Sequence, residues 1–363
     1  MHKAITTFVG LLFIASVAAC TPPPLQNKND KVGAALADPQ ASFFEASRKG
    51  NIAMVMRLLE EKRIDVNQTD AYAWTGLMYA VQNGHTGLAE YFLLRKSQIN
   101  RQDIDGLTPL MIAANERHSD IVELLLAFGA DPLLQDRHGY TALMWAIYNK
   151  SWDCIPPLLA AGKGLDLQNG FGETALHLAL DYRCSDIATM LIRRHAHVNL
   201  KDTRGRTPLH LAAEKGDHDN VRLLLAEGAD ASARDEAGEN PLMKSIQGGH
   251  ASIALLLLPQ TGNLQTTNRQ GQTALHLAVV RNLPDIAAAL IRRKADLNSF
   301  DGLGLTPLML AVESGSERMT VLLVERGADL KVKNKDGKTA LDLAREKRHG
   351  AIVDYLERKM GKP

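Results

Sequence analysis

Cysteine and aromatic residues are scarce in this chain of 363 residues, and neither sign of charge dominates. Three cysteines are too few for a disulfide-stapled scaffold or for a zinc site built from paired CxxC motifs. Aromatic residues make up 5% of the chain, which argues against a large aromatic core. The formal charge is +1, so no basic stripe of the kind that binds nucleic acid is predicted. We therefore expect no nucleic-acid partner.

The motifs of common catalytic sites are also absent. The chain has no GxSxG, no HExxH and no GxxxxGK[ST]. Gly337-Lys338-Thr339 matches the end of a phosphate-binding loop, but Val332 occupies the position of the required upstream glycine. We interpret this segment as a turn followed by a helix cap. No catalytic residue and no cofactor are predicted, and we expect the chain not to be an enzyme.

One histidine pair allows a different hypothesis, that of a metal-dependent protein. His195 and His197 form a His-x-His motif that could hold a metal ion, but the sequence offers no third ligand. We favour a variant loop and predict no metal site.

The first twenty residues resemble an export signal. Ala4 to Val17 is almost wholly apolar, and the run is shorter than the roughly 20 residues that span a bilayer. Its length suits the hydrophobic region of a signal peptide. Ala18 and Ala19 precede Cys20, and this stretch resembles the lipobox of bacterial lipoproteins, although Val17 stands where that family prefers leucine. A plain cleavage site with an incidental cysteine, and a retained membrane anchor, are the alternatives.

The lipobox resemblance implies a processed, lipid-anchored protein. Residues 1–19 would be removed, Cys20 would carry the lipid and contact the membrane, and residues 20–40 would form a flexible, proline-rich tether. Thr21, rather than aspartate, follows the cysteine. If the source is Gram-negative, the resemblance then implies an anchor in the outer membrane, facing the periplasm.

The rest of the chain repeats with a period of 33 residues. A threonine recurs in phase along the chain, with Asn240 in the one place where it is missing, and a leucine always follows two residues later. Asp or Asn always stands five residues before the threonine, and Gly stands two before it except at Ala73. A fixed period of this length is typical of a repeat architecture. The threonines are Thr75, Thr108, Thr141, Thr174, Thr207, Thr273, Thr306 and Thr339.

The residue types predict the structure of one unit. Asp or Asn with Gly favours a tight turn, and the threonine that follows is suited to cap a helix. A second helix and a glycine stop come next, as in Gly216 to Asp230. One unit cannot bury its own apolar face, so neighbouring units must stack. In repeat four, Pro156 and Pro157 predict a shorter, shifted second helix capped by Asp153.

The segments 205–216, GRTPLHLAAEKG, and 304–315, GLTPLMLAVESG, closely resemble the ankyrin-repeat family. The resemblance implies an all-α solenoid of about ten helix-turn-helix units with β-turn or hairpin tips over residues 41–363, and it implies a protein partner. The expected repeats are 41–69, 70–102, 103–135, 136–168, 169–201, 202–234, 235–267, 268–300, 301–333 and 334–360.

Partner binding by such repeats implies a concave face made of the turn tips and the exposed ends of the first helices. Repeats two to five supply aromatic and apolar residues at these positions, whereas repeats six to ten supply mostly charged and polar ones. Aromatic residues and arginine dominate binding hot spots. We predict that the contact residues are Tyr72, Trp74, Ile104, Leu107, Arg137, His138, Tyr140, Tyr148, Phe171 and Tyr182. Packing of these rings against neighbouring helices is the alternative.

These observations predict a monomeric, lipid-anchored scaffold that binds a protein in the bacterial cell envelope. The alternative is an exported or surface-displayed protein that acts on a host or neighbouring cell. The sequence leaves open whether Cys154 and Cys184, in adjacent repeats, form a disulfide.

Overall fold

The computed structural model describes residues 38–62, 64–162 and 164–361. The predicted signal peptide and Cys20, and most of the predicted tether, lie outside these residues. The described chain is all-helical, with no strand and one isolated β-bridge between Thr69 and Thr75. None of the described helices is both long and apolar enough to cross a membrane. The all-α repeat solenoid expected from the sequence is confirmed.

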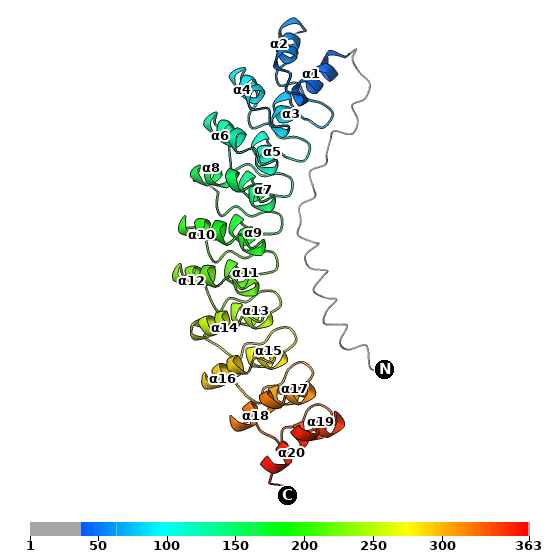
Figure 1. Ribbon diagram of the computed structural model, residues 1–363, viewed down its shortest axis with the longest axis vertical. Helices are drawn as coiled ribbons and strands as arrows, with labels where there is room; N and C mark the ends of the chain where they lie inside the picture. The colour runs from blue at the N-terminus through cyan, green and yellow to red at the C-terminus, as the bar shows by residue number, and fades with distance from the viewer. Residues whose placement is uncertain (1–37, 63, 163, 362–363) are drawn as a thin grey trace. The chain divides into compact units, whose positions relative to one another are not determined.

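The described residues divide into two compact units, with the boundary between Ala175 and Leu176. In the first unit, the helices follow one another as antiparallel pairs joined by short turns (Figure 1). They are α1 (Pro39–Arg48), α2 (Ile52–Glu61), α3 (Gly76–Gln82), α4 (Thr86–Leu94), α5 (Pro109–Asn115), α6 (Ser119–Ala127), α7 (Ala142–Tyr148), the 3-10 helix η2 (Trp152–Cys154) and α8 (Ile155–Ala160).

The second unit continues the same pattern and begins inside helix α9, whose first residue belongs to the first unit. Its helices are α9 (Ala175–Asp181), α10 (Ser185–Arg193), α11 (Pro208–Lys215), α12 (His218–Ala226), α13 (Pro241–Gln247), α14 (Ala251–Leu257), the 3-10 helix η3 (Leu258–Gln260), α15 (Ala274–Val280), α16 (Pro284–Arg292), α17 (Pro307–Glu313), α18 (Glu317–Glu325), α19 (Ala340–Glu346) and α20 (Gly350–Lys359).

In each unit the first helix of a repeat packs on its own second helix and on the first helix of the next repeat. Within a unit, these first helices form one row and the second helices another (Figure 1). The core lies between the rows, and the leucine two residues after each threonine is buried in every repeat. These residues are Leu77, Leu110, Leu143, Leu176, Leu209, Leu242, Leu275, Leu308 and Leu341.

The repeated threonine caps the first helix of its repeat, as predicted. Thr108 Oγ1, for example, accepts a 3.2 Å hydrogen bond from the backbone N–H of Met111. Asn240 performs the same role in repeat seven, since its Oδ1 accepts a 2.9 Å bond from Met243 N–H. Such caps satisfy backbone donors that the helix leaves unpaired. Thr339 is also a cap, which confirms that Gly337-Lys338-Thr339 is a turn and helix start.

The proline pair shortens the second helix of repeat four, as expected. Helix α8 has six residues, whereas α6 in the preceding repeat has nine. Pro156 and Pro157 lie in its first turn, where missing N–H groups cost little. The prediction that Asp153 caps this helix is wrong: Asp153 lies inside η2, and Cys154 occupies the cap position. Cys154 makes no side-chain cap hydrogen bond, and α8 follows directly on the 3-10 helix.

Candidate functional site

Each turn tip is held by the aspartate or asparagine that opens it. In repeat three, Asp103 Oδ1 accepts 2.9 Å hydrogen bonds from the backbone N–H groups of Asp105 and Leu107. Asp103 N–H in turn donates to the carbonyl oxygen of Leu107 at 3.0 Å. This closed loop fixes the backbone from Asp103 to Leu107, and with it the direction of each side chain in between.

Backbone hydrogen bonds also join successive tips in the first unit. Ile104 N–H donates to the carbonyl oxygen of Tyr72 at 3.2 Å, and Arg137 N–H donates to that of Asp105 at 2.9 Å. Because each tip is tied to the next, the residues at the top of the tips form one continuous row. We call Tyr72, Ile104, Arg137 and His138 the tip row. All four are exposed, with Tyr72 and Ile104 each at 41%.

Three predicted contact residues do not belong to this surface. Trp74, Leu107 and Tyr140 are 2%, 3% and 0% exposed, so the expectation that they are part of an exposed row is wrong. Each stands immediately before a cap threonine, where the closed tip directs the side chain inward. The alternative of ring packing holds here: the Trp74 ring lies 5.0 Å from that of Tyr79, and Tyr140 lies 5.6 Å from Trp145.

The buried aromatic residues also hydrogen-bond to the second oxygen of the turn aspartates. Trp74 Nε1 donates to Asp103 Oδ2 at 2.7 Å, and Tyr79 Oη donates to Asp70 Oδ2 at 2.7 Å. In repeat four, Trp145 Nε1 donates to Asp136 Oδ2 at 3.0 Å. A buried carboxylate without such partners would be destabilising. Trp74, Tyr79 and Trp145 therefore have structural roles in these repeats.

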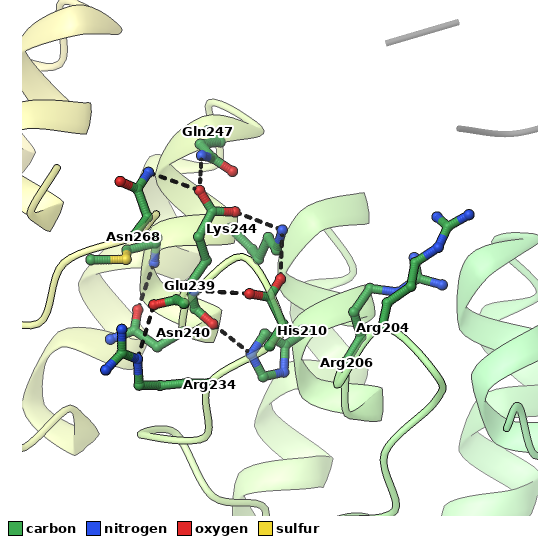
Figure 2. A network of polar contacts seen from close by, with 12 residues as sticks. Arg204, Arg206, His210, Arg234, Glu239, Asn240, Lys244, Gln247 and Asn268 are labelled. Atoms are coloured by element: carbon green, nitrogen blue, oxygen red, sulfur yellow. Dashed lines mark hydrogen bonds and ion pairs between the residues drawn. The ribbon is translucent and has the colours of Figure 1, made fainter. Parts of the chain in front are cut away.

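Two turn aspartates of the second unit, Asp202 and Asp235, are paired with cations instead. Arg206 Nε donates to Asp202 Oδ2 at 2.7 Å. Lys244 Nζ lies 2.9 Å from Asp235 Oδ2 and 2.7 Å from Glu239 Oε2 (Figure 2). The two carboxylates raise the pKa of Lys244 and outweigh the opposing effect of its burial.

Two side-chain amides also donate hydrogen bonds to the carboxylate of Glu239. Gln247 Nε2 donates to Glu239 Oε1 at 2.6 Å, and Asn268 Nδ2, from the next repeat, donates to the same oxygen at 3.1 Å. Figure 2 shows Lys244, Gln247 and Asn268 converging on this one carboxylate. The network ties repeat seven to repeat eight and has a clear structural role.

Three further predicted residues are half-buried: Tyr148, Phe171 and Tyr182. The Tyr148 ring packs edge-on against Trp145, with ring centroids 6.0 Å apart. Tyr148 and Phe171 lie in the first unit and Tyr182 in the second. Their contact with a partner stays a prediction.

Sequence reasoning missed an exposed apolar group in repeats eight and nine. Val280, Phe300 and Leu303 are 53%, 50% and 74% exposed. Leu303 and Val280 occupy the same repeat positions as Tyr72 and Tyr148, so the signal was present. It was hidden by the polar residues at the other tip positions of the second unit.

The histidine pair does not gather a metal-binding group. His195 is exposed, with a positive φ of 60°, and its Nδ1 lies 4.0 Å from Glu227 Oε2. His197 Nδ1 accepts a 3.2 Å hydrogen bond from Asn199 N–H, as Asp230 Oδ1 does from Ser232 N–H one repeat later. His197 thus replaces a turn aspartate, which supports the variant-loop interpretation. No group of three potential metal ligands was found among the described residues.

The histidines of the repeats hydrogen-bond to backbone groups of neighbouring repeats. His210 Nδ1 accepts from Thr207 N–H at 3.1 Å, so its Nε2 carries the hydrogen that is donated to the carbonyl oxygen of Glu239 at 3.0 Å. Burial lowers the pKa of His210 to about 4. His85 and His250 bond the carbonyl oxygens of Arg48 and Glu214 in the same manner. These residues have structural roles.

Cys154 and Cys184 are both buried thiols that do not form a disulfide in the structure. Burial raises the pKa of Cys154 to about 11, which disfavours the reactive thiolate. The disulfide left open by the sequence is not formed.

Known families account for most of the chain. The family described as Ankyrin repeats (3 copies) matches residues 24–103, 77–167, 143–235 and 227–301, and Ankyrin repeats (many copies) matches residues 290–344. The chain belongs to the ankyrin-repeat family. Such repeats act as protein-binding modules and are generally not enzymes.

A curated relative supports the same assignment over a short stretch. The ankyrin-repeat chain is 38% identical over 58 residues to Ankyrin repeat domain-containing protein 29 of Danio rerio. The match covers 16% of this chain and 20% of that protein.

Proposed function

We propose that this protein is a lipid-anchored ankyrin scaffold that binds a protein partner in the bacterial cell envelope through the tip row of its first unit. The exposed, tied row of Tyr72, Ile104, Arg137 and His138 carries the proposal. It combines an aromatic ring, an aliphatic side chain and a cation, the groups that contribute most to protein interfaces. Because the tip backbone is already fixed by hydrogen bonds, little entropy is lost when it binds.

Photo-crosslinking from the tip row tests the binding surface. A photoreactive residue placed at Ile104 should capture a defined partner band in intact cells, and one placed at Glu123, exposed on the second helix α6, should not. The pair Tyr72→Ser and Arg137→Ala, introduced beside the Ile104 probe, should abolish that band. Equal capture from both positions would contradict the proposed surface.

The anchor rests on the sequence around Cys20. Lipid on this cysteine would hold the repeats by a segment of about 20 residues, long enough to reach roughly 70 Å from the membrane. Cys20→Ser should leave the helical circular dichroism unchanged and move the protein from the membrane to the soluble fraction. If the variant stays with the membrane, the anchor proposal is wrong.

The location within the envelope is part of the same proposal. Thr21 supports the outer membrane facing the periplasm, and we expect the anchored chain to be a monomer. Surface display toward a host or neighbouring cell is the second candidate. Protease added to intact cells should cleave a displayed protein and spare a periplasmic one.

A further inference from the structure

The second unit carries an apolar tip where the repeat pattern normally places polar groups. Leu303 is 74% exposed, which makes it the most exposed of the large apolar residues in the described chain. Phe300, three residues earlier on the same turn, is 50% exposed. A contiguous patch of exposed large apolar side chains marks an interaction site more often than scattered single residues do.

Phe300 stands at a repeat position that elsewhere in the chain carries a polar bridge to the next repeat. At the equivalent positions, Gln102 Nε2 donates to the carbonyl oxygen of Gln135 at 2.9 Å, and Gln135 Nε2 donates to that of Gln168 at 2.9 Å. In the second unit, Arg234 Nη2 donates to the carbonyl oxygen of Thr267 at 2.7 Å. Phenylalanine has no donor and cannot perform this role. Stability of the stack therefore gives no reason for an aromatic ring at this position.

The backbone that presents Leu303 is rigid. Asp301 Oδ1 accepts 2.9 Å hydrogen bonds from the N–H groups of Leu303 and Leu305. Gly302 N–H donates to the carbonyl oxygen of Gln270 at 2.7 Å and ties this tip to the one before it. A side chain held in place before binding loses little entropy in a complex.

Cations flank the apolar tip. Lys335 Nζ donates to the carbonyl oxygen of Gly302 at 2.6 Å, and a Cβ on Gly304 would meet Lys335 Cγ at 2.6 Å, so the lysine stem lies across the tip. Arg269 and Lys333, at the neighbouring turns, are also exposed. Asp336 is the exposed carboxylate on these three tips, because Asp301 is buried as a turn residue. The tips next to Leu303 thus carry two exposed cations, Arg269 and Lys335, beside one exposed carboxylate, Asp336. Asp296 and Asp329 are exposed on the turns that precede Phe300 and Lys333.

We propose that Phe300 and Leu303, with Arg269 and Lys335 beside them, form a second docking surface for an acidic peptide segment that carries a large apolar residue. The apolar residue of the segment packs on Phe300 and Leu303, and its acidic residues face the flanking cations. Charge complementarity gives such a site its selectivity and increases the association rate. This surface lies wholly in the second unit and is separate from the tip row.

A displayed library of random peptides, each about 12 residues long and so able to span about 40 Å, tests the proposal on the full chain. We expect enrichment of peptides in which Asp and Glu flank Leu, Phe or Trp. The variant Phe300→Gln/Leu303→Ser should bind these peptides at least about tenfold more weakly. Gln at position 300 restores the donor of the polar bridge, so this variant should fold at least as well as the wild type. Lys335→Gln should weaken binding by a smaller factor and reduce its dependence on salt.

The matched control is Leu255→Ser/Val321→Ser, which removes exposed apolar residues from helices α14 and α18 of the same unit. This control should bind the enriched peptides as the wild type does. No enrichment, enrichment of basic or uncharged peptides, or equal loss in the control would overturn the proposal. Crosslinking from Ile104 reports on the first unit, so failure of this proposal and failure of the proposed function are distinguishable.

Discussion

The indole Nε1 of Trp74 donates a 2.7 Å hydrogen bond to Oδ2 of Asp103, in the tip of the following repeat. The same aspartate uses Oδ1 to hold its own turn. One buried carboxylate thus fixes a tip and joins it to the preceding repeat. This relationship gives Trp74 a structural role.

Trp74→Phe should destabilise the first unit by about 1–3 kcal/mol, because it leaves one oxygen of a buried carboxylate without a donor. The phenyl ring keeps part of the packing on Tyr79. Urea unfolding followed by circular dichroism measures the change. Tyr72→Ser, at an exposed position of the same tip, should change stability by less than about 0.5 kcal/mol. Equal midpoints for wild type and Trp74→Phe would contradict the role of this hydrogen bond.

Ala73→Gly should stabilise the protein by about 0.5–1 kcal/mol. Ala73 has φ 60°, in the left-handed region where an alanine is strained, and glycine occupies the equivalent position in the other repeats. The greater freedom of glycine in the unfolded chain offsets part of the gain. The converse change, Gly106→Ala, should destabilise, because its Cβ would lie 2.8 Å from the backbone nitrogen of Arg137. Thermal unfolding of the two variants gives shifts of opposite sign if this explanation is correct.

Lys244→Met should destabilise the second unit by about 3 kcal/mol near neutral pH, since Asp235 and Glu239 would stay buried without their cation. The loss should be smaller at pH 5, because buried carboxylates without a cation take up protons more readily. In the wild type, the pKa of Lys244 is higher in the folded chain than in the unfolded chain. Its contribution to the free energy of unfolding is therefore complete below the unfolded pKa of about 10.4, and it is lost as pH rises through the folded pKa. Urea midpoints of the wild type and of Lys244→Met, measured from pH 5 into the alkaline range, test the prediction. A penalty for Lys244→Met that does not change with pH would contradict it.

Stability should fall as pH drops from about 6.5 to 4, because His210 must stay neutral in the folded chain. Its folded pKa of about 4 lies below the unfolded value, so the unfolded chain binds more protons in this window. The shift corresponds to a cost on the order of 3 kcal/mol. Burial lowers the pKa values of His177 and His276 in the same direction. His210→Gln should flatten the acid limb of the stability profile, and an unchanged slope would show that other groups control it.

The fold was predictable because its signals are local and repeated. Thr108 and Thr141 cap helices, Asp103 and Asp136 open turns, and Leu110 and Leu143 fill the core, each at the period visible in the sequence. Because the pattern recurs in so many repeats, a single exception such as Asn240 does not change the predicted fold. The cap predicted at Asp153 was wrong because it depended on one site alone.

The candidate surface was only partly predictable, because residues two positions apart in a tip point in different directions. Tyr72 is exposed and Trp74 is buried, although both are aromatic residues of the same turn. The direction is set by hydrogen bonds that the backbone N–H groups of Tyr72 and Trp74 donate to Asp70 Oδ1. It is also set by the carboxylate of Asp103 in the next repeat, which accepts from the Trp74 side chain. Composition of a tip therefore cannot separate a binding residue from a core residue.

The sequence by itself determined the repeat period, the caps of the first helices and the family, because all of these depend on residue types at fixed spacing. The tertiary structure alone decided which tip side chains are exposed and which are buried. Folding brings Trp74 to Asp103, and Lys244 to Asp235 and Glu239. These side chains are buried in hydrogen bonds and ion pairs that stabilise the repeats. Tyr72, Ile104, Phe300 and Leu303 are left exposed because the neighbouring repeats do not cover them.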